Sequence, residues 1–161
     1  MKLLVAGIGN IFFGDDGFGP EVARALAAQP VRGVTIDDYG IRGLHLAYEM
    51  LAGYDRAILI DAMPRGGAPG TLYVSEPEMS DAGGAPDAHR MDLENVFALM
   101  RMIGGVAPPI TIVGCEPSGI EETIGLSEPV RDAVLPAVEL VRRLVTETLA
   151  GEAELERRIS I

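Results

Sequence analysis

The sequence has a single cysteine, a single lysine and no tryptophan among its 161 residues. Because Cys115 has no second cysteine with which to form an internal disulfide, a reducing compartment is the expected setting. No run of about 18 consecutive apolar residues occurs, so the sequence predicts no membrane-spanning helix. The amino terminus passes directly from Met1-Lys2 into a short apolar stretch and glycine, without the longer apolar region of a signal peptide. We therefore expect a cytoplasmic protein.

Basic residues are also few, and the formal net charge is −11 with a pI of about 4.5. Such a surface repels phosphate backbones and anionic lipids, so we expect neither nucleic-acid nor membrane binding. Hydrophobic residues make up 48% of the chain and charged residues 23%, which is the composition of a globular protein. A chain of this length buries roughly 70% of its unfolded surface, so a single domain with a substantial core is expected.

Short apolar runs alternate along the chain with segments of helical period. A run without polar alternation is typical of a strand that is buried on both faces. Glycine and proline mark most of the breaks between these segments. The pattern predicts strands at 3–6, 34–36, 57–60, 71–74 and 110–113, and helices at about 16–28, 41–51, 93–103 and 128–149.

The last helix has an apolar face that runs from Val130 to Leu149. Ser127 is its expected N-cap, and Pro136 is expected to kink it. Beyond Gly151 the sequence is charged and weakly patterned. We therefore divide the chain into one domain, 1–150, and a solvated polar tail, 151–161.

Alternation of strands and helices predicts a mostly parallel sheet with helices on both faces. The strand at 71–74 follows the preceding strand too closely for a parallel crossover, so it is expected to run antiparallel. The simplest winding places the first strand between the second and the third. The crevice at their carboxyl ends is then the topological switch point, where open α/β sheets bind ligands.

Acidic residues lie where two of these strands end. The glycine-rich loop 7–19 contains Asp15 and Asp16, and Asp61 ends the third strand. His89 precedes the third helix. Two carboxylates and an imidazole form a plausible three-ligand site for a divalent metal ion. Each also has a structural interpretation, since Asp15 or Asp16 can cap a helix, Asp61 can orient a loop and His89 can be an ordinary loop residue.

Two other functions share some of these features. Gly7-x-Gly9 after a strand is typical of a dinucleotide-binding turn, but Phe12 stands where the third glycine is required. A phospho-receiver domain has an acid pair and a strand-ending aspartate, but it also needs a lysine after the fifth strand. The only lysine is Lys2, so this alternative is weaker still.

The motif Gly-Ile-Gly-Asn-(x)4-Asp-Asp-Gly-x-Gly at 7–19 resembles the opening motif of the [NiFe]-hydrogenase maturation endopeptidases. The resemblance continues in order along the chain to about Leu149. Further matching segments are Asp38-Tyr39-Gly40-Ile41-Arg42-Gly43, Ile58-Leu59-Ile60-Asp61-Ala62, Pro69-Gly70-Thr71, His89, Thr111-Ile112-Val113-Gly114 and Ile124-Gly125-Leu126-Ser127.

The resemblance implies that Asp16, Asp61 and His89 are the metal-binding and catalytic residues. The family accepts Asp or Glu at the first of these positions, so Asp16 is no departure. The segment between Glu76 and Asp87 shows little likeness, so His89 is placed by its order in the chain. The implied fold is a three-layer α/β/α sandwich, of the phosphorylase/hydrolase-like kind. Its mixed five-stranded sheet is mostly parallel, with one antiparallel strand.

The implied reaction is a single cut that removes the C-terminal extension of a hydrogenase large-subunit precursor after nickel insertion. The nickel is then supplied by the precursor. A metal-polarised carbonyl or water and a carboxylate general base both remain open as mechanisms. We expect Gly9 and Asn10 to shape the cleft floor, Asp38 to position the substrate, and the protein to be a monomer. A silent chaperone that binds the metallated precursor without cutting it is the alternative.

Overall fold

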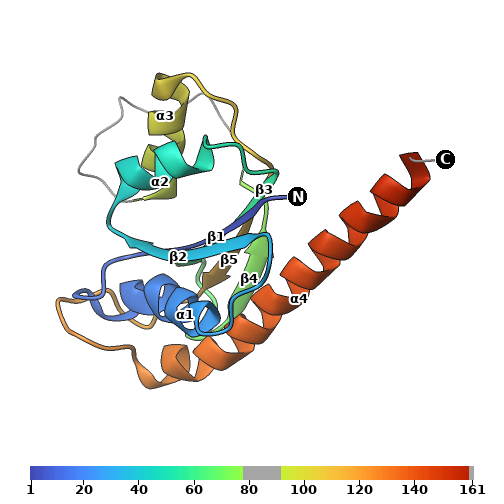
Figure 1. Ribbon diagram of the computed structural model, residues 1–161. Helices are drawn as coiled ribbons and strands as arrows, with labels where there is room; N and C mark the ends of the chain where they lie inside the picture. The colour runs from blue at the N-terminus through green and yellow to red at the C-terminus, as the bar shows by residue number, and fades with distance from the viewer. Residues whose placement is uncertain (78–91, 160–161) are drawn as a thin grey trace.

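A computed structural model describes residues 1–77 and 92–159. A five-stranded sheet of order β2-β1-β3-β5-β4 forms its centre (Figure 1). The expected place of β1 between β2 and β3 is confirmed, as is the antiparallel direction of β4 against β5. The strands are β1 (Leu3–Ile8), β2 (Val34–Gly40), β3 (Arg56–Ala62), β4 (Leu72–Ser75) and β5 (Ile110–Cys115).

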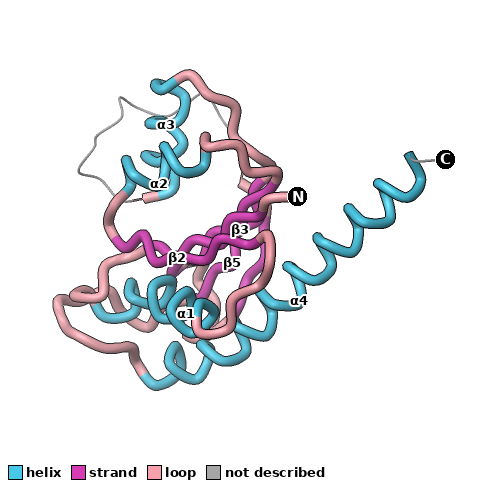
Figure 2. The backbone as a smooth tube through the Cα atoms, viewed as in Figure 1, coloured by secondary structure: helices cyan, strands magenta, loops and turns pink. Residues whose placement is uncertain are grey.

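Helices cover both faces of the sheet, so the expected three-layer α/β/α architecture is confirmed (Figure 2). Helices α1 and α4 lie on one face, and α2 and α3 lie on the other. The helices are α1 (Phe18–Ala27), α2 (Gly43–Met50), α3 (Leu93–Ile103) and α4 (Glu128–Ile159), and the short 3-10 turn η1 (Gly14–Gly17) precedes α1.

The position of β1 in the centre of the sheet explains why its sequence has no polar residue. All six of its residues are buried. Leu3 and Val5 belong to the core under α1 and α4, whereas Leu4, Ala6 and Ile8 belong to the core under α2 and α3. Since successive side chains alternate between faces, a central strand with helices on both sides has no position for a polar residue.

Helix α4 is longer than the sequence pattern indicated. It continues through Gly151 to Ile159, although an end near Leu149 was expected. Gly151 lowers helix propensity but does not break a helix, and the chain follows it with good helix formers such as Glu152 and Ala153. Pro136 lies within this helix, and the kink expected there stays a prediction. No helix in residues 1–77 or 92–159 combines the length and apolar character needed to cross a bilayer.

The start of α1 rests directly on the backbone of the sheet. A Cβ atom added at Gly19 would lie 2.2 Å from the carbonyl oxygen of Ile8 and 2.3 Å from that of Ile60. A Cβ atom added at Gly7 would lie 2.4 Å from the carbonyl oxygen of Gly19. Only glycine permits this approach, which brings the loop after β1 over the ends of β1 and β3.

Replacement of Gly19 by alanine is therefore expected to destabilise the protein. Backbone atoms on two strands must shift, which costs about 2 kcal/mol or more in the free energy of unfolding. Gly151→Ala is the matched control, because nothing lies within 4 Å of a Cβ atom at Gly151. The control is expected to leave the free energy of global unfolding nearly unchanged, with a gain of at most about 1 kcal/mol from its higher helix propensity. Urea unfolding monitored by circular dichroism measures both changes, and equal stability of the two variants would contradict the close approach.

Candidate active site

Two aspartates reach the same edge of the sheet from neighbouring strands. Asp16 lies on η1, just after β1, and Asp61 lies at the carboxyl end of β3. The two strands are paired in parallel, with Gly7 opposite Ile60. The charge of Asp16 acts on the pKa of Asp61, so the structure brings these two predicted residues together. The meeting point is the predicted switch point, between β1 and β3.

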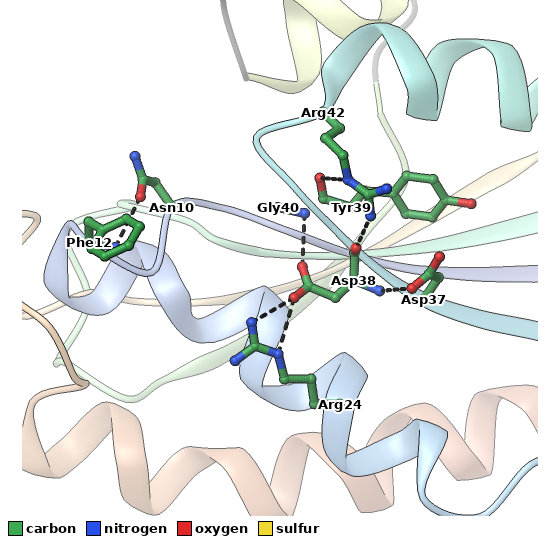
Figure 3. A network of polar contacts seen from close by, with 8 residues as sticks. All are labelled: Asn10, Phe12, Arg24, Asp37, Asp38, Tyr39, Gly40 and Arg42. Atoms are coloured by element: carbon green, nitrogen blue, oxygen red, sulfur yellow. Dashed lines mark hydrogen bonds and ion pairs between the residues drawn. The ribbon is translucent and has the colours of Figure 1, made fainter.

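The glycine-rich loop holds the Asp16 side chain in place. The backbone N–H of Asn10 donates a hydrogen bond to Asp16 Oδ2 at 2.8 Å. Gly9 has a φ of +136°, and a Cβ atom there would lie 1.8 Å from the carbonyl oxygen of Asp16. The Asn10 side chain accepts a hydrogen bond from the Phe12 N–H at 3.0 Å, which keeps the turn closed (Figure 3). Gly9 and Asn10 thus form the backbone support around Asp16.

The environment of Asp16 and Asp61 disfavours the ionised form of both carboxylates. Burial raises the pKa of Asp16, although the Asn10 N–H acts in the opposite direction. Burial also raises the pKa of Asp61 well above its usual range, and the charges of Asp16 and Asp92 raise it further. Two carboxylates in this arrangement repel each other when both are ionised, so the pair favours binding a proton or a cation.

The neighbouring Asp15 has a different role. It is buried, with 1% of its surface exposed. Its carboxylate accepts hydrogen bonds from the N–H groups of Ser118 (2.7 Å), Gly119 (3.2 Å) and Ser127 (2.7 Å), and from the Ser127 hydroxyl (2.8 Å). Burial raises the pKa of Asp15, but the hydrogen bonds from Ser127, Ser118 and Gly119 outweigh it and lower the pKa overall. Of the two adjacent acids, Asp15 is therefore the structural one.

Asp38 lies at the end of β2 with its carboxylate already engaged (Figure 3). Arg24 donates two hydrogen bonds to Asp38 Oδ2, at 3.2 and 2.9 Å, and the Gly40 N–H donates one to Oδ1 at 2.8 Å. The Arg42 guanidinium donates to the carbonyl oxygen of Asp38. Gly40 in turn accepts a hydrogen bond from the Gly9 N–H at 3.0 Å. Asp38 thus supports the loop that holds Asp16, and its role in substrate binding stays a prediction.

His89 lies outside the described residues, so its expected place beside the two aspartates stays a prediction. Over the described parts of the chain, no group of three or more His, Cys, Asp or Glu residues forms a metal site. Asp92, which the sequence analysis did not single out, caps α3 by accepting the Asn95 N–H at 2.8 Å. The negative charge of Asp92 also raises the pKa of Asp61. Its position directly before the third helical segment was the sequence signal that could have identified it as an N-cap.

A second residue missed from the sequence is Glu116, directly after β5. It is buried, and its carboxylate accepts hydrogen bonds from the N–H groups of Arg65 (2.7 Å) and Gly66 (3.1 Å) and from the Tyr73 hydroxyl (2.8 Å). The Arg65 N–H is the main cause that lowers the pKa of Glu116. Glu116 therefore fixes the loop that follows Asp61. The local sequence carries no signal for this contact, because the partners are distant in the chain.

The donor set fits a divalent cation. Asp16 and Asp61 supply carboxylate oxygens, and a cation between them would relieve the repulsion that raises their pKa values. His89, if it completes the set, would supply an imidazole nitrogen, a ligand type suited to nickel and zinc.

A pair of half-buried carboxylates with raised pKa values, at the switch point of an open α/β sheet, is typical of an enzyme active site. A family model described as "Hydrogenase maturation protease" matches residues 20–144, more than half of the chain. The chain therefore belongs to the hydrogenase maturation protease family and is a peptidase, a hydrolase.

Individual relatives agree with this assignment. The chain is 34% identical over 150 residues to the hydrogenase expression/formation protein HupD of Rhizobium leguminosarum bv. viciae, covering 89% of this chain and 74% of that protein. The hydrogenase maturating endopeptidase HybD from E. coli matches with a TM-score of 0.73 and 27% identity, over 92% of this chain and 94% of that one. A [NiFe] hydrogenase maturation protease, HycI from Thermococcus kodakarensis KOD1, matches with a TM-score of 0.72 and 25% identity, over 90% and 92%.

Removal of the Asp15 carboxylate is expected to destabilise the fold. Asp15→Ala leaves the donors of residues 118, 119 and 127 without their acceptor, at a cost of about 2–4 kcal/mol at pH 7. Because the pKa of Asp15 is lowered by folding, its contribution is present above the ordinary value of 3.8 and is lost as the pH falls through the folded-state pKa. Thermal unfolding at pH 7 and at lower pH measures the difference. A difference that grows as the pH falls would contradict this role.

Asp61→Asn is expected to have the opposite effect on stability. Because folding raises the pKa of Asp61, the wild-type protein loses stability as the pH rises above 3.8 towards the folded-state pKa. The neutral amide removes this penalty and is expected to stabilise the protein by on the order of 1 kcal/mol at pH 7.5. The gain is expected to shrink at pH 4.5. Melting temperatures at both pH values test this, with Glu139→Gln on the exposed side of α4 as control. A loss of stability at pH 7.5 would contradict the raised pKa.

Proposed function

We propose that this protease removes the C-terminal extension of a [NiFe]-hydrogenase large-subunit precursor after nickel has been inserted. The observation that carries the proposal is that Asp16 and Asp61 lie at the carboxyl ends of neighbouring parallel strands, in a chain that belongs to the hydrogenase maturation protease family. The similarity to a protein described as a [NiFe] hydrogenase maturation protease supports the choice of substrate.

The nickel ion belongs to the substrate in this proposal. Asp16, Asp61 and His89 contact it from the protease side, so the enzyme recognises a precursor that already carries its metal. The oxygen donors of the two aspartates and their mutual repulsion support this assignment. A metal ion bound there would polarise the scissile carbonyl or lower the pKa of water.

The chain's own carboxylates supply acid–base chemistry of the aspartic type. Asp61, whose pKa is raised, is the proposed general base that takes a proton from the attacking water and returns it to the leaving amine. The raised pKa belongs to the enzyme before nickel contact, and it brings the carboxyl of Asp61 closer to the operating pH at which a base works best. The Asn10 N–H holds Asp16 in orientation, and the Asp38–Gly40–Gly9 contacts hold that loop. We further propose that the enzyme acts in the cytoplasm as a monomer.

Cleavage of a large-subunit precursor tests the function directly. The purified protein is incubated with precursor with and without nickel loading, and the products are followed by gel mobility and intact mass. Loss of a C-terminal fragment is expected only from the nickel-loaded precursor. Asp16→Asn, Asp61→Asn and His89→Ala are each expected to lower the rate by about 100-fold or more, while Glu139→Gln leaves it unchanged.

The outcomes separate the alternatives. Full activity in all three variants would overturn the site assignment. Tight binding of every precursor tested without any cleavage would favour a silent chaperone. Circular dichroism of each variant distinguishes a lost catalytic group from a lost fold.

A further inference from the structure

Two exposed apolar loops lie side by side next to the acid pair. The loop after β1 exposes Phe12 (56%) and Phe13 (39%), and the loop before α4 exposes Ile120 (46%) and Ile124 (77%). The Thr123 N–H donates to the carbonyl oxygen of Phe12 at 3.0 Å, and the Gly14 N–H donates to that of Thr123 at 2.8 Å. Figure 1 shows the two loops together at the end of the sheet where β1 stops. We call Phe12, Phe13, Ile120 and Ile124 the apolar rim.

The loop before α4 is anchored by hydrogen bonds at both of its ends, although its middle is exposed. Residues 120–125 are all exposed, whereas the two flanks of this segment bind the buried Asp15 carboxylate through Ser118, Gly119 and Ser127. The Thr123 contacts tie its centre to the loop after β1. A buried carboxylate with four hydrogen bonds thus fixes a segment whose own apolar side chains face solvent. Such preorganisation lowers the entropic cost of binding a partner.

The apolar rim is continuous with the acid pair. Asp16 donates its N–H to the carbonyl oxygen of Phe13 at 3.2 Å, and Asn10, which holds Asp16, also binds the Phe12 N–H. One loop thus carries both Asp16 and the two phenylalanines of the apolar rim, so a large partner bound at the acid pair lies close to the rim.

Two exposed acids lie within the rim. Glu121 and Glu122 separate Ile120 from the Thr123 contact, and among the described residues no cation forms an ion pair with either. A matching surface would combine apolar side chains with lysine or arginine. A second copy of this chain is a poor match, because a symmetric contact would bring these acids, from a chain of net charge −11, close to their own copies.

We propose that the apolar rim is the docking surface for the large-subunit precursor, and that it takes an apolar segment of the precursor flanked by lysine or arginine. This inference rests on the proposed function. The rim holds the precursor body while the acid pair acts on the bond to be cut. Its residues therefore determine affinity for the precursor and not the rate of the chemical step.

Steady-state cleavage of nickel-loaded precursor tests this separation. Phe12→Ser and Ile124→Ser are each expected to raise KM about fivefold or more, with kcat within about twofold of wild type. Val106→Ser is the matched control, because Val106 is 92% exposed on the loop before β5, at the opposite end of the sheet. The double variant Glu121→Lys/Glu122→Lys is expected to raise KM and to weaken its dependence on salt.

The measurements also separate failure of the docking surface from failure of the function. If wild type cuts the precursor and both apolar variants keep the wild-type KM, the docking surface is wrong and the function stands. If wild type cuts no precursor, the proposed function fails. The affinity of the precursor for wild type and for Ile124→Ser then tests the docking surface independently of cleavage. Equal affinities would overturn the docking surface. Sedimentation that shows a wild-type dimer and an Ile124→Ser monomer would also overturn it, in favour of contact between copies.

Discussion

The close contact between the start of α1 and the backbone of β1 and β3 is the constraint on which the site depends. With no side chain at Gly7 or Gly19, the helix can lie directly on the two strands. The loop between β1 and α1 must then turn within a few residues over the end of the sheet. That turn places Asp16 at the same edge of the sheet as Asp61, close enough for its charge to raise the pKa of Asp61. A longer spacing between helix and sheet would leave the two carboxylates apart, so the backbone contact determines the chemistry that becomes available.

Two adjacent aspartates show how far environment determines the behaviour of a carboxylate. Asp15 receives four hydrogen bonds, and its pKa is lowered despite burial. Asp16 receives one hydrogen bond from Asn10, and its pKa is raised. The hydrogen bonds to Asp15 stabilise the fold. The environment of Asp16 destabilises its ionised carboxylate, so this group favours binding a proton or a cation. A stable fold can carry the strained pair because well-satisfied acids such as Asp15 and Glu116 hold the surrounding loops.

The sequence predicted most of the fold because local patterns report burial. Apolar runs marked the central strands, and the short connection before the strand at 71–74 required an antiparallel direction. Asp61 was found because it ends a buried strand at the switch point. The residues alone left Asp15 and Asp16 as alternatives, since the difference depends on Ser118 and Ser127, about a hundred positions away. Only the resemblance to the maturation endopeptidase family identified Asp16, and not Asp15, as the site residue. Glu116 was missed for the same reason, and the end of α4 was misplaced because glycine is a weak helix breaker.

The length of α4 has a consequence for the dynamics of the molecule. The part up to Leu149 packs against the sheet through Val130, Val141 and Val145, whereas most described side chains beyond Leu149 are exposed. Figure 1 shows the C-terminal end of α4 projecting away from the sheet. The projecting turns have little beyond their own backbone hydrogen bonds and contacts such as Arg157 with Glu154 at 3.1 Å. Short helical segments without tertiary packing are marginally stable in water. Amide protons at the projecting end will therefore exchange with solvent by local fraying, independently of global unfolding. One continuous helix thus contains both a well-packed, protected part and a weakly protected projecting end.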